Sequence, residues 1–349
     1  MVRKFSLLLL IVMFLINCNF ITKSKNKKVK NPSEYTWTID TLVVSVAFEP
    51  AFRPMDILYI NDEDIYLFGR NAHWNDIYFH YDGEKWQDYE SYVIKELTSA
   101  TFTNNIIYGT GRNHVNVGSK GQIVSYRNNK WQKELTLEKE NTEFHDIIAL
   151  SEHDIWAGGY NGVLYHFNGN EWQDYSLPDT ISIKDFSYHE DHGLYALAYC
   201  YFPDNSNREG NKYILKWTGE NWEIIEYIRL EDYDYRFIPF GTSDINLTDE
   251  YIYSCGSGVF RRKYNETNWT KLYMNFEATY YDISSSSDDN IYIVGEWGTA
   301  DHWDGKNPTI LDSIAFKNVI FTTSWTDGKQ VYITGWDFDK NCSYVIHGK

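Results

Sequence analysis

The sequence predicts an all-β protein, a seven-bladed β-propeller, and three observations support this prediction. Aromatic residues, which are enriched in strands, are abundant, with 29 Tyr, 13 Trp and 19 Phe among 349 residues. A strand-like phrase recurs seven times, and a turn that usually ends in Trp follows each of its first six copies. The two ends of the repeat region also look like complementary parts of one unit. Blades of four short strands give such a pattern.

The first repeated phrase contains apolar and aromatic residues and usually ends in Gly. Its aromatic residues lie between 39 and 58 residues apart, which fits the length of a four-stranded blade. We assign the phrase to the second strand of each blade. The seven copies are Ile65–Gly69, Ile107–Gly111, Ile155–Gly158, Leu194–Leu197, Ile252–Gly256, Ile291–Gly295 and Val331–Gly335. The first strands are then expected at Met55–Ile60, Ala100–Thr103, Phe144–Leu150, Ile183–Tyr188, Phe240–Leu247, Tyr281–Ser284 and Val319–Trp325.

The second repeated phrase is an aromatic residue, a turn pair, two polar residues and Trp. Pairs such as Asp82-Gly83 supply the positive φ angles of tight hairpins. We therefore assign it to the turn between the third and outermost strands, with the Trp packing between neighbouring blades. The copies are Tyr81–Trp86, Tyr126–Trp131, Phe167–Trp172, Trp217–Trp222, Tyr264–Trp269 and Trp303–Pro308, where Pro replaces the Trp.

The seventh unit lacks an outermost strand. Tyr344–Ile346 form its third strand, His347-Gly348 resembles the turn, and the sequence ends at Lys349. At the other end, Tyr35–Asp40 reads like an outer strand with no unit before it. We therefore expect the N-terminal strand to pair with the C-terminal blade, which closes the ring and removes an exposed strand edge.

The repeats of residues 35–349 resemble those of bacterial propeller proteins in which an Asp-Ile-Trp-like strand precedes an Asp-Gly-x-x-Trp-like hairpin. Asp154–Trp156 and Asp82–Trp86 show the two parts. The hairpin is also distantly similar to the Asp-box of sialidase-type propellers, although here Asp82 and Gly83 are adjacent. Kelch repeats are a poorer match, because a Gly pair in the second strand occurs only at Gly158-Gly159.

The N-terminus is typical of a secretory signal peptide. Arg3 and Lys4 precede the apolar run Leu7–Ile16, which is too short to span a bilayer. The run ends in Leu15-Ile16-Asn17-Cys18, which resembles the bacterial lipobox, although Asn17 stands where Gly, Ala or Ser is usual. The resemblance implies that residues 1–17 are removed and that Cys18 carries a lipid. The alternative is ordinary signal cleavage beside an incidental cysteine.

The sequence thus divides into three segments. Residues 1–17 are a lipoprotein signal peptide, residues 18–34 are the lipidated cysteine and a flexible Lys-rich tether, and residues 35–349 are the propeller. We expect the protein to be anchored by lipid in a bacterial cell envelope, at the outer membrane, on the periplasmic or the surface side.

Charge and cysteine content argue against several classes of partner. The formal net charge is −17, with 49 acidic against 32 basic residues, so the protein repels phosphate backbones and nucleic-acid binding is not expected. Cys200, Cys255 and Cys342 form no Cys-x-x-Cys pair, and we expect no metal and no cofactor. One disulfide between two of these cysteines is possible after export, and the sequence does not determine which two pair.

Loops that join second to third strands, or one blade to the next, share one face of a propeller, which we call the loop face. Such loops commonly carry function because the blades hold them rigidly. The alternative for any one residue is a solvated loop position or packing between blades. His80, His166 and His302 occupy equivalent third-strand positions and therefore cannot converge on one metal. The candidate ligand-binding residues are Arg70, His73, Trp74, Arg112, His114, Arg236, Trp297 and Trp336.

We therefore expect a non-catalytic binding or scaffolding propeller that recognises a glycan, a peptide or an envelope protein on this face. The alternative is a carbohydrate-active enzyme, a hydrolase or lyase, that uses the same face. The sequence contains no Gly-x-Ser-x-Gly nucleophile elbow and no His-Glu-x-x-His metal helix, so the binding function is favoured.

Overall fold

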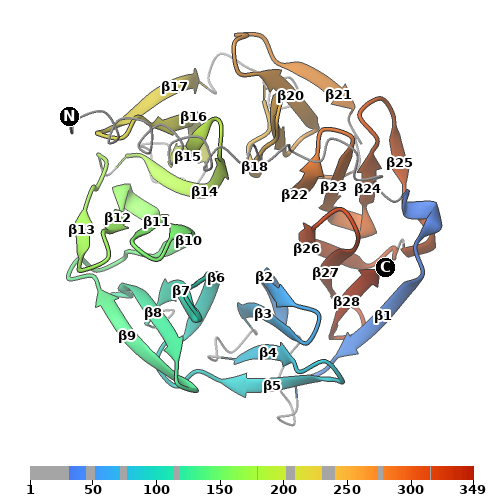
Figure 1. The fold of residues 1–349 in the computed structure, drawn as a ribbon, viewed down its shortest axis with the longest axis horizontal. Coiled ribbons are helices and arrows are strands. Elements are labelled where there is room, and N and C mark those ends of the chain that lie inside the picture. The colour runs from blue at the N-terminus through green and yellow to red at the C-terminus, as the bar shows by residue number, and fades with distance from the viewer. Residues whose placement is uncertain are drawn as a thin grey trace, which may run out of the picture.

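The computed structural model of the protein describes residues 31–44, 52–70, 77–113, 118–178, 180–201, 209–229, 240–273, 278–314 and 316–349. They form a ring of seven four-stranded antiparallel sheets (Figure 1). The predicted seven-bladed β-propeller is thereby confirmed. Cys18 and the signal peptide lie outside the described residues, as do four candidate ligand-binding residues: His73, Trp74, His114 and Arg236.

In blades 1 to 6 the strands follow one another in sequence order from the channel outward, and in blade 7 the outermost strand is β1. Blade 1 contains β2 (Arg53–Asn61), β3 (Asp64–Arg70), β4 (Ile77–Tyr81) and β5 (Trp86–Glu90). Blade 2 contains β6 (Glu96–Thr103), β7 (Ile106–Arg112), β8 (Gly121–Arg127) and β9 (Lys130–Thr136). Blade 3 contains β10 (Phe144–Ser151), β11 (Asp154–Gly159), β12 (Leu164–Phe167) and β13 (Trp172–Asp174). Blade 4 contains β14 (Ser182–His189), β15 (Gly193–Tyr201), β16 (Glu209–Trp217) and β17 (Trp222–Ile228).

The remaining blades repeat the arrangement. Blade 5 contains β18 (Asp244–Leu247), β19 (Tyr251–Cys255), β20 (Val259–Lys263) and β21 (Thr270–Tyr273). Blade 6 contains β22 (Tyr280–Ser287), β23 (Asn290–Gly295), β24 (Ala300–Trp303) and β25 (Pro308–Ile310). Blade 7 contains β26 (Val319–Thr326), β27 (Val331–Asp337), β28 (Cys342–Gly348) and, from the other end of the chain, β1 (Trp37–Leu42). Short 3-10 turns are η1 (Pro32–Glu34), η2 (Tyr160–Gly162), η5 (Glu296–Gly298) and η6 (Asp312–Ile314).

Ring closure takes place between the two ends of the chain, as the sequence predicts. β1 pairs antiparallel with β28, from Trp37 opposite Gly348 to Leu42 opposite Ser343. The backbone groups of Thr36 and Lys349 exchange two further hydrogen bonds of 2.9 and 3.2 Å. Blade 7 therefore gains its outermost strand, and its third strand does not remain an open edge.

Aromatic packing between neighbouring blades forms the core. Trp131 of blade 2, for example, packs edge-on against Phe68 and Tyr78 of blade 1, with ring centroids 6.1 and 5.7 Å apart. Each of the predicted outer-strand Trp residues lies in or against a hydrophobic cluster. The assignment of the second phrase to the turn before the outermost strand is thus confirmed. The predicted first strands of the seven blades fall within or overlap β2, β6, β10, β14, β18, β22 and β26.

Third-strand histidines belong to this packing. His80 stacks on Tyr66 and His166 stacks on Trp156, each at 4.3 Å between ring centroids. His302 lies opposite Tyr292 in the same register. The shared position explains the repeat of these histidines, because each imidazole covers the second-strand aromatic ring of its own blade.

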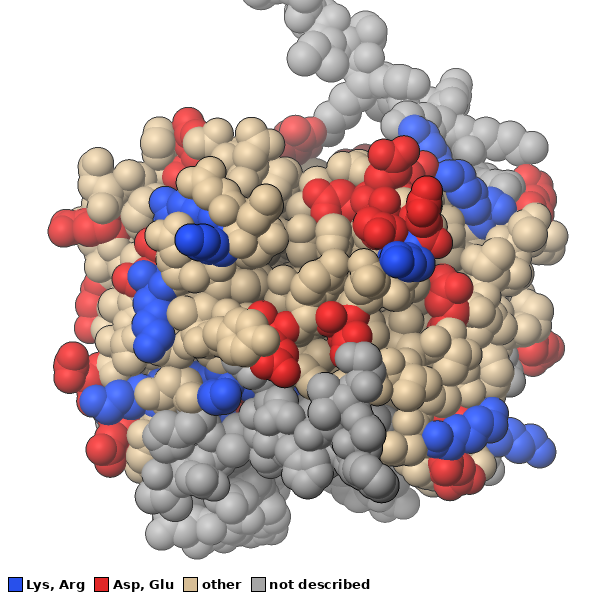
Figure 2. Space-filling view, turned by 90° about the horizontal axis from the view of Figure 1, so that it is seen from below, with Lys and Arg blue, Asp and Glu red and all other residues tan. Residues whose placement is uncertain are grey.

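Three further observations concern the cysteines, the helices and the surface charge. Among the described residues, Cys200, Cys255 and Cys342 are free thiols. No helix in the described part of the chain is long and apolar enough to cross a bilayer. Seen edge-on, the ring carries acidic and basic side chains interspersed with uncharged ones (Figure 2).

Candidate functional site: the channel mouth and its aromatic rim

First strands from all seven blades surround a central cavity of about 320 Å³. In six of them a β-bulge interrupts the pairing with the second strand at an equivalent point. A bulge leaves one residue unpaired and turns it away from the ladder. The unpaired residues all line the cavity, together with Ser243 of blade 5: Met55, Thr98, His145, Lys184, Tyr281 and Thr322. The repeat therefore delivers one variable side chain per blade to the channel.

The residue after this position is Asp in five blades, and it ties each blade to the next. Asp56 accepts a hydrogen bond of 2.7 Å from the backbone N–H of Ala100. Asp146 accepts one of 2.7 Å from Phe186, and Asp282 accepts one of 2.8 Å from Ser324. Asp185 and Asp244 bond Ile245 and Ile283 in the same way, at 3.2 and 2.8 Å. The acids at the channel thus hold the seams between blades.

Burial determines the protonation of these acids. Desolvation raises the pKa of Asp56 to about 6. For Asp185 and Asp282, desolvation and the neighbouring carboxylate of Asp244 raise the pKa well above the usual value. Carboxyl groups this close and this buried do not all ionise together. The channel therefore carries less negative charge at neutral pH than its composition suggests.

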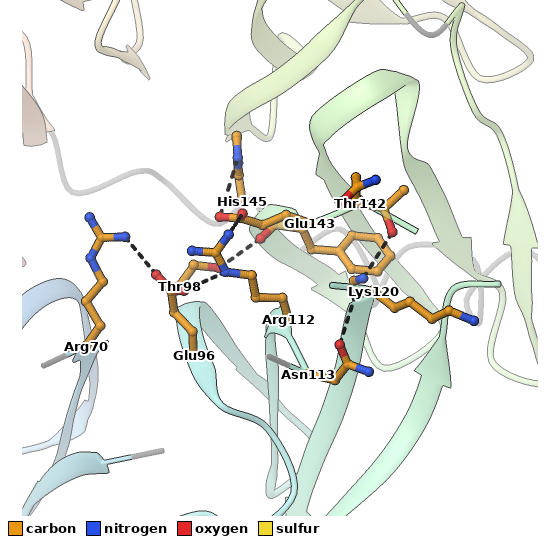
Figure 3. Close-up of polar contacts among 12 residues, drawn as sticks. Arg70, Glu96, Thr98, Arg112, Asn113, Lys120, Thr142, Glu143 and His145 are labelled. Atoms are coloured by element: carbon orange, nitrogen blue, oxygen red, sulfur yellow. Dashed lines mark hydrogen bonds and ion pairs between the residues drawn. The ribbon is translucent and has the colours of Figure 1, made fainter. Parts of the chain in front are cut away.

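An ion-pair chain crosses blades 1 to 3 at the mouth (Figure 3). Arg70, at the end of β3, and Arg112, at the end of β7, both bind the carboxylate of Glu96, at 2.9 and 2.7 Å. Arg112 also binds Glu143 at 2.8 Å. The side chain of Glu96 is fully buried, so its charge is offset by two guanidinium groups rather than by water.

Glu143 ends the chain of ion pairs at the cavity itself. Desolvation raises the pKa of Glu143 to about 7, although the Arg112 guanidinium opposes the shift. His145 lies 3.7 Å from Glu143, and its Nδ1 is 3.2 Å from the carbonyl oxygen of Ile183. Its ring stands edge-on to that of Tyr160, with centroids 4.7 Å apart. Blades 1 to 4 therefore present a polar and internally bonded half of the mouth.

Blades 6 and 7 carry an aromatic group on the loop face, which we call the aromatic corner and define as Trp297, Trp336 and Phe338. Trp297 and Trp336 each contact Phe338, with centroids 6.1 and 6.0 Å apart and ring planes at 86° and 68°. The guanidinium of Arg53 lies 4.1 Å above the Trp336 ring, a cation–π contact. Because Arg53 pairs in register with Arg70, it connects the aromatic corner to the ion-pair chain.

Trp297 has an unusual backbone. Among the described residues, nine other than Gly have a positive φ, and seven of these are Asn. The remaining two are Tyr92 and Trp297, with φ of 57° and 56°. Both are aromatic, both lie in connections on the loop face, and their exposed fractions are 81% and 58%. A bulky residue in this conformation is a genuine outlier, and such outliers cluster at functional sites.

The structure thus brings four predicted residues into two groups. Arg70 and Arg112 share Glu96, as the repeated Gly-Arg pairs at the ends of two second strands suggest. Trp297 and Trp336 share Phe338. Sequence reasoning missed five features of the mouth: Arg53, Phe338, Glu96, Glu143 and the channel acids. An available signal was the recurrence of Asp before an apolar residue in the first strands, as in Asp56-Ile57, Asp146-Ile147 and Asp282-Ile283.

Comparisons with known proteins support the architecture. No protein-family model matches the chain, and no curated protein does so either. Among solved structures, YCF48 bound to D1 peptide is similar with a TM-score of 0.65 and 13% identity, covering 91% of this chain and 97% of that one. YCF48 from Cyanidioschyzon merolae has a TM-score of 0.60 and 15% identity, covering 88% and 98%. The WD40 β-propeller domain of Doa1 has a TM-score of 0.60 and 11% identity, covering 89% and 97%. At these identities the likeness concerns the fold, and it agrees with the geometry: the chain is a seven-bladed β-propeller.

Proposed function

We propose that the chain is a non-catalytic binding or scaffolding propeller whose aromatic corner holds a peptide segment of a protein partner. The observation that carries the proposal is Trp297, an exposed aromatic side chain on left-handed backbone in the connection between β23 and β24 on the loop face. The turn requires the left-handed conformation but not a Trp to adopt it, since Asn161 holds the equivalent position in blade 3. Exposed Trp residues are also among the side chains that contribute most to binding at protein interfaces.

The shape of the aromatic corner favours a peptide. Its rings stand at steep angles to one another, so an apolar side chain placed between Trp297 and Phe338 contacts two ring faces at once. Arg53, stacked over Trp336, offers donors to a peptide carbonyl or carboxylate beside that side chain. One propeller of similar fold, YCF48, is known in a complex with D1 peptide.

The other predicted ligands have less support. A sugar ring stacks on one flat aromatic face, whereas the corner presents ring faces at a steep angle to one another. Most glycoside hydrolases use two carboxyl groups that act on one glycosidic bond. The carboxylates at the mouth instead bond Arg112 or backbone N–H groups, as Glu143 and Asp56 do.

A random-peptide display library, selected on the purified protein beside a glycan array, tests the proposal. We expect selected peptides to contain an aromatic or branched apolar residue, because such a side chain fills the corner. Trp297→Asn should raise the Kd of these peptides by about tenfold or more, measured by fluorescence polarisation. Tyr188→Ala is the matched control, since Tyr188 is an exposed aromatic residue of β14 and should leave the Kd unchanged. Selection of glycans alone, or equal binding by the Trp297→Asn protein, would contradict the proposal.

We also propose that a lipid on Cys18 places the propeller on an envelope membrane. The support is the sequence Leu15–Cys18 and the Lys-rich residues that follow it, which suit a tether close to anionic lipid head groups. Cells fed a fatty-acid analogue should label the wild-type protein, and Cys18→Ser should abolish the label while the protein is still produced. Labelling of the Cys18→Ser protein would contradict the anchor and leave the peptide site untouched.

A further inference from the structure

Two turns on the face opposite the loop face bring imidazole and carboxylate groups together across a blade seam. His189 is the last residue of β14, the turn that follows it carries Asp191 and His192, and the turn between β18 and β19 carries Asp249. One ligand atom from each of His189, Asp191 and Asp249 lies within 4.8 Å of the others. We propose that these three residues form a binding site for a divalent transition-metal ion of the Zn²⁺ or Ni²⁺ class.

The donor set selects this class of ion. An imidazole nitrogen with two carboxylate oxygens suits Zn²⁺, Ni²⁺ and similar ions, whereas Mg²⁺ and Ca²⁺ prefer oxygen ligands alone. Ligand atoms about 2.0–2.2 Å from a tetrahedral Zn²⁺ lie roughly 3.4 Å apart. Asp191 and Asp249 are both exposed, so small rotations of their side chains suffice to close the set around an ion.

The existing contacts position the imidazole for this role. His189 Nε2 lies 3.1 Å from Asp249 Oδ1, and its Nδ1 accepts a long hydrogen bond of 3.3 Å from the backbone N–H of Asp191. An ion at Nε2 takes the place of the proton between His189 and Asp249. The ring proton moves to Nδ1, which gives up its contact with the Asp191 N–H.

A second imidazole lies beside the three ligands. The ring centroid of His192 is 5.0 Å from that of His189, and His192 Nε2 lies 2.9 Å from the backbone carbonyl oxygen of Asp249. His192 also stacks on Tyr264 of blade 5 at 3.4 Å. The turn of blade 4 is thus already docked on blade 5, and a metal ion joins two parts that are held in place without it.

The same turns in other blades show what is special here. In blade 3 the equivalent turn carries His153 beside Glu152, 3.4 Å apart, and no third ligand belongs to that pair in the described residues. At the seam between blades 7 and 1, Asp62 of the equivalent turn binds Lys349, which follows β28, at 3.0 Å, and this is an ion pair without an imidazole. Among these turns, the seam between blades 4 and 5 is where the residues suit a transition metal.

Isothermal titration of the protein, free of any affinity tag, with ZnCl₂ at pH 7.5 tests the site. We expect one ion per chain at this site, a parallel response to NiCl₂, and no heat from MgCl₂ or CaCl₂. His189→Ala and Asp249→Asn should each weaken Zn²⁺ binding by about tenfold or more, because each removes one of three ligands; a tenfold change corresponds to about 1.4 kcal/mol. His153→Ala removes an exposed histidine from the equivalent turn and should change nothing.

Two measurements keep the proposal open to refutation if one variant folds poorly. Asp191→Asn alters an exposed ligand without removing the contact between His189 and Asp249, so it should weaken binding in a folded protein. Co²⁺ should give visible absorption bands of a low-symmetry site in the wild type, and these should be absent from Asp249→Asn. The proposal is overturned if the wild type binds no Zn²⁺, or if His189→Ala, Asp191→Asn and Asp249→Asn all bind it as the wild type does.

Discussion

Blades 3 and 6 make the same turn between their second and third strands, but they fill it with different residues. In η2 the middle residue is Asn161, with φ 57° and ψ 42°, and in η5 it is Trp297, with φ 56° and ψ 33°. The Gly before each turn closes it with the same 2.9 Å hydrogen bond, to Val163 in blade 3 and to Thr299 in blade 6. The turn therefore requires a residue with positive φ at its middle position, and it does not require the aromatic side chain found there in blade 6.

The two middle side chains also point to different partners. Asn161 donates from its side-chain amide to the carbonyl oxygen of Asn141 at 3.1 Å, and its backbone N–H bonds Ser182 at 3.1 Å. Trp297 instead contacts Phe338 and leaves more than half of its surface in solvent. Blade 3 thus uses this position for folding, whereas blade 6 leaves its side chain largely in solvent, available to the peptide that we propose as ligand.

A second difference between the same blades lies at the other end of their sheets. In blade 3, His166 is 2.8 Å from the carboxylate of Asp154. In blade 6, His302 is 2.9 Å from the amide oxygen of Asn290. Burial lowers the pKa of His302 to about 4, although Asp304 and Asp289 oppose the shift. A neutral partner and a dry site thus keep this imidazole uncharged.

The largest effect that we expect from this comparison is on the pH dependence of stability. The pKa of His302 in the folded protein lies below its unfolded value, so its contribution is complete above pH 6.5 and is lost as the pH falls towards 4. The loss should be on the order of 2 kcal/mol. Urea unfolding at several pH values should show that His302→Gln, which does not titrate, loses less stability over this window than the wild type.

The buried acids change stability with pH in the opposite direction. The informative quantity is therefore the difference in unfolding free energy between the wild type and His302→Gln. Burial raises the pKa of Asp56 and Asp301 to about 6, and their contribution is present below pH 4 and lost as the pH rises through 6. These groups are unchanged in the variant and cancel in the comparison. If His166→Gln flattened the pH profile of stability as much as His302→Gln, the exchange of Asp154 for Asn290 as the histidine's partner would have no effect on stability.

The fold was predictable because its signals repeat. Seven copies of one strand phrase and six of one turn phrase gave the blade number, and the unmatched ends gave the closure of β1 on β28. These features depend on local sequence, because the alternation of apolar and polar residues predicts strands and the turn residues predict hairpins.

The candidate site was predictable only where it followed the repeat. Arg70 and Arg112 occur at equivalent strand ends and do meet, through Glu96. Phe338 and Arg53 have no repeated signal. The contact of Phe338 with Trp297 depends on how blade 6 meets blade 7, and that of Arg53 with Trp336 depends on how blade 7 meets blade 1. The positive φ of Trp297 could not be predicted from the sequence Gly-Glu-Trp-Gly alone. Comparison with Gly-Tyr-Asn-Gly at the same place in blade 3 shows which residue adopts it.

The smallest expected effect gives the sharpest test of the comparison. Asn161→Ala removes a residue that tolerates left-handed backbone and a side-chain hydrogen bond, so it should lower the free energy of unfolding by about 1–2 kcal/mol. Trp297→Asn relieves backbone strain but gives up part of the apolar contact with Phe338, and the two terms offset each other to within about 0.5 kcal/mol. Urea midpoints at unchanged m-value measure both. A marked loss of stability in the Trp297→Asn protein would mean that the tryptophan serves the fold after all, because a side chain kept for a ligand is one that the folded chain does not need.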